Sequence, residues 1–268
     1  MSEALHVESA LMRQTLLDRD LVAPATARPV IRLLPNLHVV KIGGHSVFDR
    51  GRDAILPVVD ELKGAMKEHK LLITTGTGIR GRHVFEVGLD LGLPTGVLAG
   101  LASVDAEKNG HMLAALLAEE GVVYLPHQSV GHHLPVFLAA VPAVVANGYP
   151  PYGLYEFPPE VGRIPPHRTD AGAFLLADAY GAARLVYADD VDGIFTADPA
   201  TDPGATLIPQ ATAAELQGLA TLPIDRIVLE LMASAKHIKQ IQVVNGLRPG
   251  AITRALAGEH VGTIVTAG

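Results

Sequence analysis

Two glycine-rich segments carry cationic side chains that could bind an anion. Lys41 ends an apolar run, 36–42, and Gly43 and Gly44 follow it. A lysine in an apolar strand is costly to bury unless it meets an anion, and neighbouring glycines let backbone amides approach that anion. Because the lysine precedes the glycines, the segment is neither a Walker loop nor a dinucleotide-binding fingerprint. It indicates an anion site of another kind.

The second glycine-rich segment, 76–82, follows the next apolar run, 71–75, and contains Gly78, Arg80 and Arg82. Arginine beside free backbone amides is typical of phosphate sites. An ordinary turn with solvated arginines is the alternative for one such loop. Two such loops after two strands favour phosphate binding.

A third segment, 185–199, turns from an apolar run into a loop with four acids, Asp189, Asp190, Asp192 and Asp198. Open α/β sheets bind ligands just beyond the carboxyl ends of their strands, which is where these acids are predicted to lie. Aspartates also form ordinary polar turns, so the segment alone leaves both interpretations open.

A fourth segment, 126–133, is predicted as a loop and holds His127, Gln128, His132 and His133. Neutral imidazole binds metals, and protonated imidazole binds oxyanions. The alternative is a polar loop with an exposed histidine pair.

Strands must alternate with helices to place these segments. The predicted strands are 36–42, 71–75, 122–125, 143–146, 185–187, 240–244 and 261–266, and the predicted helices are 53–66, 84–91, 104–119, 171–181, 227–239 and a short one from 249. This alternation predicts a single α/β domain, 36–268, with a mostly parallel sheet covered on both faces.

Two further segments lack such a pattern. Residues 1–35 hold one possible helix, 11–20, and are expected to be an arm that packs on a neighbouring subunit, or else a loosely ordered terminus. Residues 149–168 are rich in Pro, Tyr and Gly. We expect a lid, an intersubunit contact or a surface loop there.

Composition excludes several classes of protein. The chain has 268 residues, a formal net charge of −7 and no cysteine. The negative charge argues against a general nucleic-acid surface, and the missing cysteines exclude disulfides and thiolate metal sites. No apolar run is long enough to span a membrane, so we expect a cytoplasmic protein without nucleic-acid or membrane partners.

Five blocks in order resemble the amino-acid-kinase superfamily, most closely its uridylate kinase branch. They are 39–44, 76–82, 168–173, 188–199 and 242–264. The resemblance implies a three-layer α/β/α sandwich that binds ATP with Mg²⁺ at the carboxyl ends of its strands, usually in a hexamer. Lys41, Gly43 and Gly44 would contact the phosphates, and Gly78 and Arg82 would lie between nucleotide and acceptor. The acidic segment would hold the adenosine through Asp189, Phe195 and Asp198, with Asp190 beside them.

The chain departs from the uridylate kinase pattern mainly on the acceptor side. Ile79 stands where the family has an amide, Arg168 replaces a threonine, and Asp189-Asp190 replaces Thr-Lys. Glu107 is nearest to the position of the acidic residue that holds the acceptor ribose. The departures argue against phosphorylation of UMP, while ATP binding is expected to remain.

Three blocks and part of the arm are similar to the molybdenum storage proteins, and most to their β-type subunits. These are 127–133, 150–157, 163–168 and 13–20. The resemblance implies a cage of three α and three β subunits that uses ATP to load molybdate or tungstate as polyoxometalate clusters. His127, Gln128, His132 and His133 would contact these clusters. Whether this subunit hydrolyses ATP stays open, and a uridylate kinase or a silent ATP-binding partner is the alternative.

Overall fold

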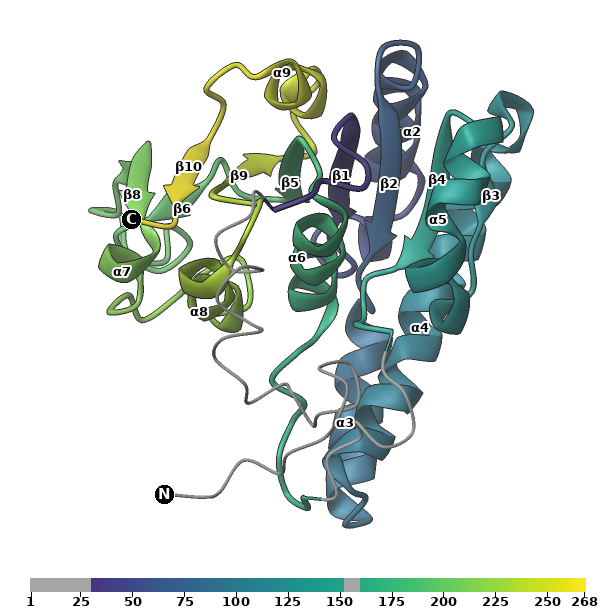
Figure 1. Ribbon diagram of the computed structural model, residues 1–268. Helices are drawn as coiled ribbons and strands as arrows, with labels where there is room; N and C mark the ends of the chain where they lie inside the picture. The colour runs from purple at the N-terminus through teal and green to yellow at the C-terminus, as the bar shows by residue number, and fades with distance from the viewer. Residues whose placement is uncertain (1–29, 152–159) are drawn as a thin grey trace, which may run out of the picture. The chain divides into compact units, whose positions relative to one another are not determined.

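The computed structural model describes residues 30–151 and 160–268 (Figure 1). The predicted helix 11–20 and the central part of the segment 149–168 lie outside these residues. The chain divides into the units 1–31 and 32–268, and the helices and strands of the described residues belong to the second unit.

A mostly parallel eight-stranded sheet forms the centre of this unit, in the order β3-β4-β2-β1-β5-β9-β10-β8. β10 runs antiparallel to β9 and parallel to β8, and the other neighbours pair in parallel. The strands are β1 (Leu37–Ile42), β2 (Lys70–Thr75), β3 (Val123–Tyr124), β4 (Ala143–Asn147), β5 (Arg184–Asp189), β8 (Gln210–Thr212), β9 (Gln240–Asn245) and β10 (Thr263–Thr266).

Helices cover both faces of the sheet, which confirms the predicted three-layer α/β/α fold (Figure 1). They are α2 (Arg52–Ala65), α3 (Ile79–Asp90), α4 (Thr95–Leu116), α5 (His127–Ala140), α6 (Thr169–Tyr180), α7 (Ala213–Leu216), α8 (Ile227–Ser234) and α9 (Ala251–Ala257). Apolar side chains of α5, α6 and α8 pack on one face, and those of α2, α9 and the end of α4 pack on the other.

The central strands are apolar throughout because both of their faces are covered. Val39 and Val40 are neighbours on β1, and both are fully buried in opposite core clusters. A strand that is covered on both faces needs apolar residues at every position, which explains the continuous apolar runs. Lys41 is therefore exceptional as the one charged residue in this strand's interior.

Several predicted element boundaries were wrong. α3 and α4 begin at Ile79 and Thr95, well before the predicted starts at 84 and 104. The missed starts contain Gly81 in α3 and Gly96 and Gly100 in α4, and glycine weakens a helical pattern. The two helices nevertheless form and pack closely, since a Cβ at Gly88 of α3 would lie 2.2 Å from a methyl carbon of Leu98 of α4. Such close helix packing outweighs the low helix propensity of glycine.

Other elements were missed or mistaken. α8 ends at Ser234, not at 239. β8, α7, and the two-stranded sheet of β6 (Ile194–Phe195) and β7 (Leu207–Ile208) were not predicted, since strands of two or three residues show no period. The histidine segment predicted as a loop is the start of α5. In the described parts of the chain, no helix is both long and apolar enough to cross a membrane.

Candidate functional site

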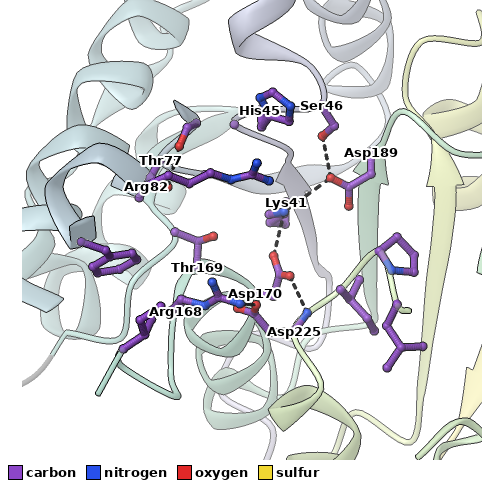
Figure 2. A pocket seen from close by; sticks show the side chains of 18 of the residues that line it. Lys41, His45, Ser46, Thr77, Arg82, Arg168, Thr169, Asp170, Asp189 and Asp225 are labelled. Atoms are coloured by element: carbon purple, nitrogen blue, oxygen red, sulfur yellow. Dashed lines mark hydrogen bonds and ion pairs between the residues drawn. The ribbon is translucent and has the colours of Figure 1, made fainter. Parts of the chain in front are cut away.

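A cleft of about 840 Å³ opens beyond the carboxyl ends of β1, β2 and β5 (Figure 2). Its lining comes from these strand ends, from α3, from the start of α6, and from the segment 220–226 before α8. The strands bring together the segments that the sequence predicts to bind anions. In the middle of the cleft lies Lys41, with acidic side chains on two sides of it.

Lys41 is held between two carboxylates. Its Nζ lies 2.7 Å from Oδ1 of Asp170 and 3.6 Å from Oδ1 of Asp189. Burial alone would lower the pKa of Lys41, but these two carboxylates outweigh burial and raise it above its usual range. The lysine is therefore a fixed positive charge at neutral pH, ready to meet an anion.

A third acid extends the cluster from the segment before α8. The backbone N–H of Asp225 donates to Oδ2 of Asp170 at 2.8 Å, and Arg168 pairs with the Asp225 carboxylate. Burial, reinforced by the charge of Asp170, raises the pKa of Asp225 to about 7. Asp225 thus exchanges its proton near neutral pH.

Asp189 is the acid best placed to hold a cation. Ser46 Oγ donates to its Oδ1 at 2.7 Å, while its Oδ2 is buried without a hydrogen-bond partner among the described residues. Burial raises the pKa of Asp189, although Lys41 opposes the rise. A carboxylate oxygen with no partner suits Mg²⁺, which takes one or two carboxylates together with phosphate oxygens. The described residues contain no group of three or more His, Asp or Glu arranged to hold a metal by themselves.

The two glycine-rich segments meet backbone to backbone. Gly43 N–H donates to the carbonyl of Ala188 at 2.9 Å, and Gly76 N–H donates to that of Ile42 at 3.0 Å. A Cβ at Gly44 would lie 2.2 Å from the backbone nitrogen of Gly78. No side chain fits between Gly44 and Gly78, so the two segments pack main chain against main chain beside the cleft.

Most of the predicted ATP-binding residues line this cleft: Lys41, Gly44, Gly78, Arg82, Asp189 and Asp190. Gly43 lies directly behind it, where a Cβ would meet Ser46 and Asp189. Phe195 and Asp198 instead line a smaller pocket of about 180 Å³, which shares Leu222 and Pro223 with the cleft. The structure therefore separates Asp189, beside Lys41, from the other two residues predicted to hold the adenosine.

The predicted metal residues diverge because they lie on a helix. His127 is buried, and its Nε2 lies 2.6 Å from the carbonyl oxygen of Pro150, so that it fixes the chain after β4. Gln128, His132 and His133 are exposed on α5. Gln128 and His132 are four residues apart and share one side of the helix.

Sequence reasoning missed part of the cluster. Asp170 was not predicted as a site residue, although a buried Lys41 demands a counter-charge that Asp170 supplies. No sequence pattern marks Ser46 or Asp225, because each joins the cluster by a hydrogen bond to a residue far along the chain. Asp190, which replaces a family lysine, pairs with Arg50.

Comparisons with known proteins agree with this architecture. The model of the amino acid kinase family matches residues 36–245. The molybdenum storage protein subunit beta of Azotobacter vinelandii is 49% identical over 263 residues, covering 97% of each chain. A uridylate kinase of Methanocella arvoryzae is 30% identical over 242 residues, covering 85% of this chain and 98% of its own.

Solved structures show the same fold. The uridylate kinase from Archaeoglobus fulgidus superposes with a TM-score of 0.67 at 21% identity, covering 85% of this chain and 99% of its own. The UMP kinase from Bacillus anthracis gives 0.64 at 20% identity, covering 90% and 97%. With the match of the family model and the arrangement of the cleft, these findings establish that the chain belongs to the amino acid kinase family.

Proposed function

We propose that this protein is a subunit of a molybdenum storage protein that binds ATP with Mg²⁺ in the cleft and takes part in ATP-dependent loading of molybdate. The observation that carries the ATP part is the position of Lys41, buried at the end of β1 between two backbone-lined glycine segments. The storage part is supported by the 49% identical relative, whose similarity extends over 97% of both chains.

Phosphate oxygens are the natural partner of the Lys41 side of the cleft. Backbone amides and a fixed ammonium both bind an anion, and Lys41 lines the same cleft as Gly44 and Gly78. Asp189 would hold Mg²⁺ through its Oδ2, which has no hydrogen-bond partner in the described part of the chain, and the ion would offset the negative charge of the phosphates. We therefore assign Asp189 to the phosphate end of the nucleotide, and keep Phe195 and Asp198 for its adenosine end.

The exposed face of α5 is the proposed contact for molybdate. Gln128, His132 and His133 offer an amide and two imidazoles to solvent, whereas His127 is engaged with Pro150 and serves the fold. Condensation of molybdate into polyoxometalate clusters consumes protons, and imidazoles supply positive charge and protons near neutral pH. We propose that this face lines the interior of a hexameric cage shared with a homologous α subunit, and that tungstate is accepted there as well.

Uridylate kinase is the second candidate, supported by the 30% identical relative of that name. Several features of the cleft argue against it. Arg168 is engaged by Asp225 where the family pattern has a threonine, and Asp190 presents an acid where the pattern has a lysine. The first change puts a charged pair where the pattern has a neutral hydroxyl, and the second replaces a positive charge with a negative one.

Molybdenum retention tests the proposal directly. The full chain, produced together with its α partner, is incubated with molybdate, Mg²⁺ and ATP, desalted, and assayed for molybdenum by elemental analysis. We expect retention that depends on ATP, and a clear decrease in the double variant His132→Ala/His133→Ala. The matched control is His83→Ala, which removes an exposed histidine on α3. Retention equal to background in the unaltered protein would refute the storage function.

A coupled assay separates the two candidates. ADP formation that requires UMP would favour the uridylate kinase, whereas ADP formation that responds to molybdate would favour storage. Protection against thermal unfolding by ATP, without ADP formation, would identify a subunit that binds the nucleotide only for stability.

A further inference from the structure

A buried asparagine attaches the second glycine-rich segment to α4. Nδ2 of Asn109 donates to the carbonyl oxygen of Gly76 at 2.6 Å, and the Asn109 side chain is fully buried. Gly76, Thr77 and Gly78 line the cleft, whereas Asn109 is not among the described residues that line it. Asn109 therefore holds this segment from the side that faces away from the cleft.

The two partners of the Asn109 amide fix its orientation. Its Oδ1 accepts a hydrogen bond from Nη2 of Arg80, the second residue of α3. A guanidinium can only donate and a carbonyl oxygen can only accept, so the amide cannot exchange its oxygen and nitrogen. Asn109 thus joins α3 to the glycine-rich segment and always presents its N–H group to the Gly76 carbonyl.

The bond from Asn109 determines which polar group of the peptide between Gly76 and Thr77 faces the cleft. In a planar trans peptide the carbonyl and the following N–H point in opposite directions. Because Asn109 binds the Gly76 carbonyl from the far side, the Thr77 N–H points towards the cleft. This N–H makes no hydrogen bond to another described residue. A backbone donor in this position attracts an anion, whereas a carbonyl oxygen would repel it.

We propose that Asn109 is a positioning residue for phosphate binding: by holding the Gly76 carbonyl towards α4, it keeps the Thr77 N–H available to a phosphate oxygen. The inference rests on the proposed binding of ATP in the cleft and deepens it. It assigns part of the preference of the cleft for phosphate to a side chain that lies outside the cleft lining.

A second hydrogen bond between the same two elements supplies a matched control. Oγ1 of Thr75 donates to the carbonyl oxygen of Ala106 at 2.7 Å, and so ties the end of β2 to α4 about one turn before Asn109. Thr75→Val removes this buried bond with little change in side-chain shape and leaves the Gly76 carbonyl bonded. If Asn109 served only the fold, substitutions at the two positions would affect ligand binding alike.

Calorimetry of the full-length chain with ATP and Mg²⁺, with adenosine, and with inorganic tripolyphosphate tests the proposal. In Asn109→Asp the carboxylate still pairs with Arg80 but has no hydrogen to donate to Gly76. We expect the affinities for ATP and tripolyphosphate to fall by roughly tenfold or more, and the affinity for adenosine to stay the same. Asn109→Ala, which introduces no buried charge, should show the same pattern. Thr75→Val should bind all three ligands like the unaltered protein.

Two results would overturn the role of Asn109. One is an affinity for ATP and tripolyphosphate within about twofold of the unaltered protein in both Asn109 variants, and the other is an equal loss in Thr75→Val or for adenosine. Thermal unfolding of each variant shows that the proteins compared are folded. Failure of the unaltered protein to bind ATP would instead overturn the proposed function, while tripolyphosphate, which needs no adenosine contacts, still tests Asn109. Failure to bind either ligand would overturn both.

Discussion

The cleft and the start of α5 contrast two ways in which polar residues gather. In the cleft, charged groups from β1, β5, α6 and the segment 220–226 converge on one buried place although they are far apart in sequence. At the start of α5, the histidines are close in sequence, but the helix turns His127 into the core and His132 and His133 outward. Residues at the ends of different strands therefore came together in one place, whereas residues close together in the sequence did not.

The largest expected effect concerns the centre of the cleft. Lys41→Met leaves Asp170 and Asp189 buried without their counter-charge, and breaking a buried pair in this way costs about 3–5 kcal/mol. Urea unfolding measures the loss of stability, and calorimetry should show that ATP binding is lost. Lys67→Ala, an exposed change, should stay within about 0.5 kcal/mol. A loss below about 1 kcal/mol for Lys41→Met would show that the cluster does not depend on its lysine.

The next effect concerns the buried member of the histidine segment. His127→Ala removes the partner of the Pro150 carbonyl and leaves a small cavity, which together cost roughly 2–3 kcal/mol. His132→Ala and His133→Ala should each change the free energy of unfolding by less than about 0.5 kcal/mol. Urea unfolding of the three single variants checks the ranking. Equal losses of unfolding free energy in all three variants would show that His127 contributes no more to the fold than the exposed His132 and His133.

In the cleft, the titration of Asp225 should make the free energy of unfolding depend on pH. The pKa of Asp225 rises from an ordinary 3.8 in the unfolded chain to about 7 in the fold. Between these values the folded chain binds more protons than the unfolded one, so Asp225 lowers the free energy of unfolding as the pH rises. From pH 5 to 7 this contribution is about 2 kcal/mol.

The variant Asp225→Asn isolates this contribution. Its free energy of unfolding should fall less between pH 5 and 7 than that of the unaltered protein, when both are measured by urea titration. Identical pH slopes would mean that Arg168 and Lys41 keep Asp225 ionised throughout this range.

The fold was predictable because its strands are apolar throughout and its helices alternate with them. Lys41, Gly44, Gly78 and Asp189 follow or end predicted strands, and in the structure they line one cleft. What could not be predicted depends on contacts between distant segments: the pairing of Asp225 with Asp170 and Arg168, or of Asp49 with Ile79, follows from tertiary placement and leaves no local pattern. The helical state of 127–133 was missed because its first buried apolar residues, Val130 and Leu134, stand among polar residues and a glycine and show no clear apolar repeat.

The contact between Gly44 and Gly76 has a consequence for which substitutions the cleft tolerates. A Cβ at Gly44 would lie 2.7 Å from the carbonyl carbon of Gly76, and a Cβ at Gly76 would lie 2.6 Å from the backbone nitrogen of Gly44, so neither glycine can be replaced unless both loops move. The partly exposed charged residues at the rim carry no such main-chain constraint, as at Asp190, which pairs with Arg50. The main-chain contact between the two loops therefore constrains the cleft more strongly than the side chains at its rim do.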